Sequence, residues 1–442
     1  MRRIYSVLLL ASAFLVSCGT DDGFTNTAPI PSGRLTVINA IPNSPTLTVE
    51  TNNLRSGNIS FGEATPANTV LPQIPLDFRV SFTNQNSVQT VVETEVTLDI
   101  DFRQTIILTG SIDNATITSI VDSPFTYEAT STDARIRFLN ATTSVASASL
   151  ALTNPNGTDA TVAMTNGQPT GFTTTTSGDG NQIEVRDSSS DAVLWRSGEF
   201  FISPRADRLL VLVDYFGPGD ENVRLISIND PSGTALFPNE EIISAVRFSN
   251  QAATFGPLDF LVDGTIAATL DFGGISDYVE FPQGTKTFSV TPAGDPTTEL
   301  NSIDRTMFRG AFHNFQTATN VDATLVGSGF SVEDRRPIDT QSVVNITKLA
   351  PAVESIDLYF QNNAEALTGN PDIAGLTNFG SGALILRPNN YDLYITEQGN
   401  QTVLVGPIAL GLESKGIYTI QITDSDGGGT PLQVVLLDDF QN

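Results

Sequence analysis

The stretch Arg34–Glu50, "RLTVINAIPNSPTLTVE", holds the pattern that decides the fold, because the chain repeats it three more times. The other copies are "RIRFLNATTSVASASLAL" from Arg135, "AVRFSNQAATFGPLDFLV" from Ala245 and "VVNITKLAPAVESIDLYF" from Val343. Each copy carries apolar residues at the same four register positions without a gap. These positions are Leu35, Val37, Leu47 and Val49; Ile136, Phe138, Ala148 and Leu150; Val246, Phe248, Leu258 and Phe260; Val344, Ile346, Ile356 and Leu358.

This spacing predicts two β-strands in every copy. Apolar residues two apart indicate a strand with one buried face. A constant offset between the two strands predicts the same hairpin-like unit four times. The residues between them, such as Asn39–Pro42 and Asn140–Thr142, include turn formers.

Two further strands follow in each repeat. A turn precedes "PLDFRVSF" from Pro75, "NQIEVRD" from Asn181, "KTFSV" from Lys286 and "YDLYI" from Tyr391. The repeats then close on "TIILTG" from Thr105, "RLLVLVDYF" from Arg208, "VDATLVGSG" from Val321 and "IYTIQIT" from Ile417. About seven short strands in about 100 residues match an immunoglobulin-like sandwich. Such close spacing leaves no room for helical crossovers and predicts antiparallel sheets.

The fold expected is therefore all-β, with four tandem antiparallel β-sandwich, immunoglobulin-like domains. We place them at 34–123, 134–228, 243–332 and 341–442. The linkers between them are short, which predicts a semi-rigid rod.

The N-terminus predicts export and a lipid anchor. Arg2 and Arg3 precede a run of about ten apolar residues, too short for a hydrocarbon core that needs roughly 20. The run ends in Leu15-Val16-Ser17-Cys18, which resembles a bacterial lipobox, and Cys18 is the only cysteine. The resemblance implies a signal peptide at 1–17, acyl chains on Cys18 and a tether at 18–33. Several acyl chains on one residue give stable anchoring. Gly19 after the cysteine favours the outer membrane, on its periplasmic or cell-surface face.

Composition limits the partners and the chemistry. The net charge is −27, and removal of residues 1–17 takes away two arginines and no acid, which brings it to −29. Such a surface argues against binding nucleic acid, whose affinity depends largely on phosphate neutralisation. One cysteine allows no internal disulfide and no thiol-based metal site.

A family resemblance adds to this. "SNQAATFGPLDFLVDG" (Ser249–Gly264) and "FGGISDYVEFPQGTKTFSVTPAG" (Phe272–Gly294) resemble domain of unknown function 4397. The first repeat is similar through "VINAIPNSPTLTV" and "ISFGEATPANTVLP", and the fourth through "LAPAVESIDLYF". The second departs, because "NGQPTGFTTTTSGDG" replaces the Phe-Gly step. The resemblance implies a β-sandwich envelope protein, often tandem behind a lipoprotein signal, without established catalytic residues.

Candidate catalytic residues are weak. His313 is the only histidine, which excludes a histidine-based metal cluster, and we expect it near an aromatic patch. Asp99 and Asp101 lie two apart on a predicted strand, where they would share one solvated face. We expect no catalytic residue and no cofactor.

Acidic turns and aromatic residues are the candidate binding features. "TDSDGGGT" (Thr423–Thr430) and "GPGDEN" (Gly217–Asn222) are glycine-rich and acidic. Calcium prefers six to eight oxygen ligands, which makes Asp424 and Asp426 weak calcium candidates within a predicted hairpin turn. The densest aromatic group is expected mainly in the core. It comprises Trp195, Phe200, Phe201, Tyr215 and Phe216.

These observations predict a non-catalytic, lipid-anchored cell-envelope protein whose domains contact protein or polysaccharide. The abundance of acids keeps two alternatives open: an envelope glycan hydrolase that uses carboxylates, and a calcium-assisted glycan-binding adhesin.

Overall fold

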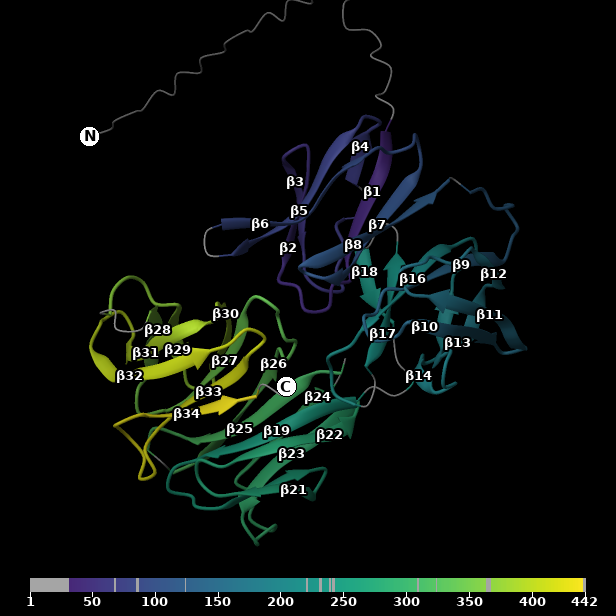
Figure 1. Cartoon of the computed structure of the whole chain (residues 1–442). Coiled ribbons are helices and arrows are strands. Elements are labelled where there is room, and N and C mark those ends of the chain that lie inside the picture. The colour runs from purple at the N-terminus through teal and green to yellow at the C-terminus, as the bar shows by residue number, and fades with distance from the viewer. Residues whose placement is uncertain are drawn as a thin grey trace, which may run out of the picture.

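The computed structural model describes residues 32–439 except 67–68, 85–86, 124, 220–221, 230–232, 238–239, 241–242, 308–309, 323 and 363–366. Every regular element in this part of the chain is a β-strand. Within the same ranges, no helix is long and apolar enough to cross a membrane. The strands form eight sheets, two for each of four sandwiches (Figure 1).

The first sandwich joins the sheets β4-β1-β7-β8 and β3-β2-β5-β6. Its strands are β1 (Ser32–Asn39), β2 (Leu47–Thr51), β3 (Leu54–Ile59), β4 (Thr69–Pro72), β5 (Leu76–Asn84), β6 (Ser87–Val96), β7 (Arg103–Ser111) and β8 (Asn114–Asp122).

The second sandwich joins β12-β9-β16-β17-β18 and β11-β10-β13-β14, with β15 also paired to β13. Its strands are β9 (Asp133–Asn140), β10 (Ser147–Asn154), β11 (Gly157–Thr165), β12 (Thr173–Thr176), β13 (Gly178–Asp187), β14 (Val193–Arg196), β15 (Phe200–Ile202), β16 (Asp207–Asp214), β17 (Val223–Asn229) and β18 (Gly233–Leu236). β18 extends this sandwich past the boundary at residue 228 expected from sequence.

The third sandwich joins β22-β19-β25-β26 and β21-β20-β23-β24, and the fourth joins β30-β27-β33-β34 and β29-β28-β31-β32. The third has strands β19 (Ile243–Gln251), β20 (Leu258–Val262), β21 (Thr265–Leu270), β22 (Ile275–Pro282), β23 (Gly284–Pro292), β24 (Asn301–Met307), β25 (Phe312–Thr319) and β26 (Val326–Glu333). The fourth has strands β27 (Ser342–Leu349), β28 (Ser355–Asn362), β29 (Ile373–Thr377), β30 (Ser381–Leu386), β31 (Asn389–Glu397), β32 (Val403–Leu412), β33 (Ile417–Thr423) and β34 (Gln433–Asp438).

The repeated register positions build the four cores. All sixteen side chains named in the sequence pattern are at most 1% exposed, and each set of four belongs to one core cluster. Burial of these side chains provides the main driving force for each sandwich, roughly 1.5–3 kcal/mol for each large side chain. The predicted all-β sandwich architecture is confirmed.

Two features differ from the sequence interpretation. The two strands of the repeated pattern, such as β1 and β2, lie in opposite sheets and face each other across the core, so they are not a hairpin. Each sandwich also contains one parallel pair among its antiparallel ones: β1 with β7, β9 with β16, β19 with β25 and β27 with β33. A parallel pair needs a long crossover. Here the crossover is the second sheet rather than a helix.

A turn that contacts the end of the first strand recurs in every sandwich, just before the edge strand that pairs with it. A residue with positive φ donates its backbone N–H to the carbonyl oxygen at the end of the first strand, over 2.8 Å each time. The pairs are Gly62 with Asn39, Gly167 with Asn140, Gly273 with Asn250 and Phe379 with Lys348. The second repeat therefore makes the same turn with Asn166-Gly167 that two others make with Phe-Gly. Glycine suits this turn because positive φ strains other residues.

The sandwiches are packed as face-to-face pairs, and the expected rod is wrong (Figure 1). Outer-face residues of β1, β7 and β8 form one apolar cluster with those of β9, β16 and β17. The outer faces of β19 and β25 contact those of β27 and β33 through hydrogen bonds such as Ser249 to Gln421. Sequence spacing could not show this, because a short linker fixes distance but not orientation.

The closing strand of the third repeat was also misplaced by sequence. The strand parallel to β19 is β25 (Phe312–Thr319), not the segment from Val321. His313, Asn314 and Gln316 interrupt the apolar alternation of β25. Gln316 donates to Thr347 of the fourth sandwich, and Asn314 donates to Glu333, which also accepts from Thr419 of that sandwich.

Candidate functional site

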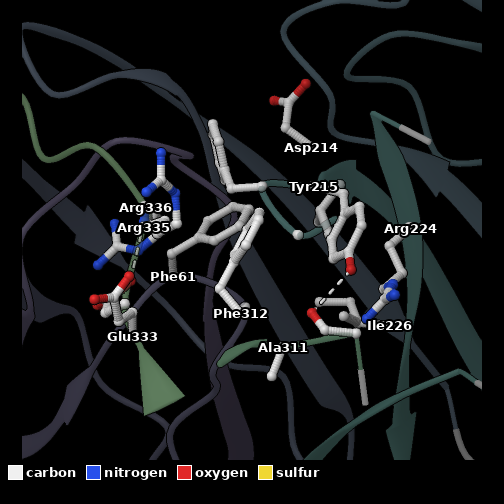
Figure 2. A pocket seen from close by; sticks show the side chains of 16 residues that line it. Phe61, Asp214, Tyr215, Arg224, Ile226, Ala311, Phe312, Glu333, Arg335 and Arg336 are labelled. Carbon is white, nitrogen blue, oxygen red and sulfur yellow. Dashed lines mark hydrogen bonds between the residues drawn. The ribbon is translucent and has the colours of Figure 1, made fainter. Parts of the chain in front are cut away.

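The strongest candidate site is a pocket where three sandwiches meet. It has a volume of about 280 Å³ and more apolar than polar wall. The turn between β3 and β4 supplies Phe61, the end of β16 and the following loop supply Asp214 to Gly217, and β25 begins at its floor with Phe312. The segment between β26 and β27 closes it with Arg335 and Arg336. Figure 2 shows these side chains.

Aromatic rings form the centre of the wall. Phe61 packs edge-on against Phe216 with ring centroids 5.9 Å apart, which joins the first and second sandwiches. Tyr215 donates its hydroxyl to the carbonyl oxygen of Gly310 over 3.1 Å, which joins the second and third. Gly310 has a φ of 58°, which favours glycine, and a Cβ there would lie 2.9 Å from Nη2 of Arg224. The pocket is thus built from contacts between domains.

Three arginines line the pocket on two sides. Arg224 of β17 stacks its guanidinium 3.8 Å from the Tyr215 ring centre. Arg336 donates Nη1 to the carbonyl oxygens of Pro42 and Ser44, over 3.1 Å and 2.7 Å, and burial lowers its pKa. Arg335 lies 3.6 Å from Oδ2 of Asp439 and 5.2 Å from the Phe312 ring centre. Figure 2 places Arg224 on the side opposite Arg335 and Arg336.

The two buried carboxylates at the wall are held by other partners. Asp214 accepts hydrogen bonds from the backbone and hydroxyl of Thr143 and from Ser144. Glu333 accepts from Asn314, Tyr278 and Thr419 at the contact with the fourth sandwich. Burial and the Glu333 charge raise the pKa of Tyr278. A third carboxylate of the lining, Asp334, is exposed and accepts the backbone N–H of Arg336 over 3.0 Å. The pocket wall therefore holds as many carboxylates as arginines.

Comparison with known families identifies the repeat. The model of "Domain of unknown function (DUF4397)" matches residues 33–151 and 244–359, more than half of the chain. The chain belongs to this family. Each DUF4397 match begins in the first sandwich of a face-to-face pair and ends within the second strand of the next sandwich, β10 or β28. The chain is therefore two copies of a two-sandwich arrangement.

The other comparisons add no function. No curated protein matches the chain. A solved structure, the Bacillus anthracis TIE protein, is 13% identical over 89% of this DUF4397 chain and 68% of that chain, with a TM-score of 0.16.

The acidic turn of the fourth DUF4397 repeat is the predicted hairpin turn. It joins β33 to β34, and Ser425 donates its N–H to Gly429 O over 3.1 Å. Asp424 is 3% exposed, whereas Asp426 is exposed. Burial raises the pKa of Asp424, and Lys348 opposes this rise. No cluster of three or more His, Cys, Asp or Glu side chains able to hold a metal occurs among the described residues.

The other sequence candidates are dispersed. Cys18 lies outside the described residues, as does part of "GPGDEN". Asp99 and Asp101 lie in the irregular turn between β6 and β7, so their predicted strand is wrong. His313 lies in β25, where its ring is 5.7 Å from Phe330 and burial lowers its pKa.

The aromatic group divides between core and pocket. Trp195 is 1% exposed in the second core and packs near Phe237. Tyr215 and Phe216, in contrast, line the pocket. Sequence reasoning missed the pocket arginines because it treated 333–340 as a linker. The one available signal was Arg335-Arg336 in a strongly acidic chain.

Proposed function

We propose that this DUF4397 protein is a non-catalytic lipoprotein of the cell envelope, anchored through Cys18 in the outer membrane. Its sandwiches present surfaces for contact with proteins or polysaccharides. The observation that carries the proposal is the arrangement of the sheets. The sheets with β1, β9, β19 and β27 are used in contacts between sandwiches, whereas edge strands of the other sheets, such as β6 and β24, have mostly exposed residues.

The state of the buried acids supports a binding role over hydrolysis. Paired-acid hydrolysis needs two carboxyl groups that face a substrate. Asp214 instead accepts hydrogen bonds from Thr143 and Ser144 of its own sandwich, and Glu333 accepts one from Thr419 across the contact with the fourth sandwich.

The anchoring is tested by metabolic labelling with an alkyne fatty acid, followed by membrane fractionation. We expect label on the wild-type protein and its recovery with the outer membrane. Cys18→Ser should remove both, whereas Ser17→Ala, which keeps a small residue before the cysteine, should retain them. Unlabelled, fully soluble wild-type protein would refute the anchor.

The binding role is tested with residues 24–442 on an array of envelope polysaccharides, with and without calcium. Saturable binding without cleavage supports the proposal, and loss on chelation would favour the calcium-assisted adhesin. Cleavage of any glycan, abolished by neutralising one acidic pair, would instead establish a hydrolase. Without glycan binding, cross-linking in intact envelopes tests the protein-contact arm.

A further inference from the structure

The junction pocket gathers three arginines in a chain of net charge −27. It takes Arg224 from the second sandwich and Arg335 and Arg336 from the segment before the fourth. Arg335 lies 3.6 Å from Asp439, which also pairs with Arg247.

The lining also holds Asp214, Glu333 and Asp334, so its formal charges balance. Asp214 and Glu333 accept hydrogen bonds from other partners, and Asp334 accepts the backbone N–H of Arg336 over 3.0 Å. An anion is therefore recognised through the guanidinium donors, which suit a carboxylate, and not through net charge.

Arg336 is the best-placed group for an anion. Its Nη1 is fixed by Pro42 O and Ser44 O, so the guanidinium plane is held in place before any ligand arrives. A guanidinium carries five N–H donors, and two carbonyl acceptors leave Nε and Nη2 for a carboxylate. Prior fixation lowers the entropic cost of binding.

The centre of the pocket suits a flat apolar group. Phe61, Phe312 and Tyr215 present rings to the same space, and Ile226 and Ala311 line it below them in Figure 2. Aromatic rings prefer edge-to-face or offset contacts with another ring. The volume of about 280 Å³ lies at the small end of ligand pockets, which suits a single-ring molecule.

We infer that this pocket binds a small aromatic carboxylate, with its carboxyl group against Arg336 and Arg335 and its ring among Phe61, Phe312 and Tyr215. Inorganic phosphate supplies charge without the ring, and a neutral aromatic alcohol supplies the ring without charge. The site therefore distinguishes benzoate from both. Because the walls come from three sandwiches, bound benzoate also stabilises their arrangement by mass action.

The test is isothermal titration calorimetry of residues 24–442 with benzoate, phosphate, benzyl alcohol and cyclohexanecarboxylate. We expect saturable binding of one benzoate, weaker binding of cyclohexanecarboxylate, and none of phosphate or benzyl alcohol. Arg336→Gln should weaken benzoate binding about tenfold or more, since it removes a charge-assisted hydrogen bond. Arg305→Gln, an arginine over Phe330 outside the pocket, should leave it unchanged.

Ala311→Leu provides a second variant, because it fills the pocket without removing a charge or a domain contact. It should also abolish benzoate binding while the thermal unfolding of the free protein changes little. The inference is overturned if benzoate does not bind up to its solubility limit. It is equally overturned if phosphate binds as tightly, or if Ala311→Leu binds benzoate like the wild type.

Discussion

The two face-to-face contacts between sandwiches use the same strands and opposite chemistry. Between the first and second sandwiches the central outer-face positions are aliphatic, and between the third and fourth they are polar. Eight positions illustrate this, as four pairs that lie opposite each other on the two parallel strands of one sandwich. They are Ile38 and Ile107, Leu139 and Val211 in the first contact, and Ser249 and Gln316, Thr347 and Gln421 in the second.

This difference changes what holds each contact together. The apolar contact depends on buried area, which is non-directional and tolerates small shifts. The polar contact depends on individual partners, such as Gln421 Oε1, which accepts from Ser249 and Gln251 over 2.7 Å and 3.1 Å. Loss of one partner leaves a buried polar group unsatisfied. The polar contact should therefore specify one orientation more strictly.

The largest effect is expected from a charge in the apolar contact. Ile107 of β7 is fully buried in the apolar cluster between the first two sandwiches, so Ile107→Asp places a carboxylate without a partner there. We expect the free energy of unfolding to fall by about 3–5 kcal/mol, or the pair to separate. Denaturant unfolding measures this. Val121→Asp, at a position 45% exposed on neighbouring β8, should cost little. An equal loss in both variants would contradict the assigned contact.

A comparable effect is expected when the ion pair of the polar contact is broken on one side. Arg247 donates to Asp439 over 2.7 Å and 3.0 Å, with side chains only 5% and 12% exposed. Asp439→Ala should cost about 3–5 kcal/mol, because Arg247 stays buried without its carboxylate. The double variant Arg247→Met with Asp439→Leu should recover most of this loss. A double-mutant cycle by denaturant unfolding checks it, and additive losses would argue against coupling.

The sandwich cores were predictable from sequence because their signal is local. Leu35 and Val37 alternate on one strand, and Leu47 follows at a fixed offset in every repeat. Ile38 of β1 and Ala40 just after it lie on the opposite face, in the apolar cluster between the first two sandwiches, which the alternation did not predict. Ser249 and Gln251 carry no signal of burial, since polar outer faces are normally solvated.

The junction could not be predicted, because it depends on the relative placement of domains. Phe61, Tyr215 and Phe312 are far apart in the chain and read as ordinary strand-edge aromatics. The parallel pairs were missed for a related reason. Pairing β1 with β7 requires the chain to return after the whole second sheet, and no local pattern encodes that return.

A smaller effect is expected at the edge of the polar contact. Phe379 packs against β26, where a Cβ added to Gly329 would lie 2.6 Å from its ring. Gly329→Ala should cost about 1–3 kcal/mol through overpacking. Phe379→Gly should rescue this variant, because it removes the clash and glycine tolerates the positive φ of 59°. Thermal unfolding of the two single variants and the double variant measures the coupling. A double variant no better than Gly329→Ala would place the strain elsewhere.

The smallest effect concerns Lys348, which replaces Asn39, Asn140 and Asn250 of the other repeats. The lysine is fully buried and donates to Ala350 O, and burial lowers its pKa from 10.5 to about 8, opposed by the Asp424 charge. Between about pH 8 and 10 the unfolded chain therefore binds more protons at this site than the folded chain. Stability from Lys348 rises with pH across that window. Denaturant unfolding at about pH 7, 8.5 and 9.5 measures this. We expect the free energy of unfolding of the wild type to increase relative to that of Lys348→Asn as the pH increases. A difference between the two proteins that does not change with pH would mean that Lys348 has the same pKa in the folded and unfolded chains, which would contradict this prediction.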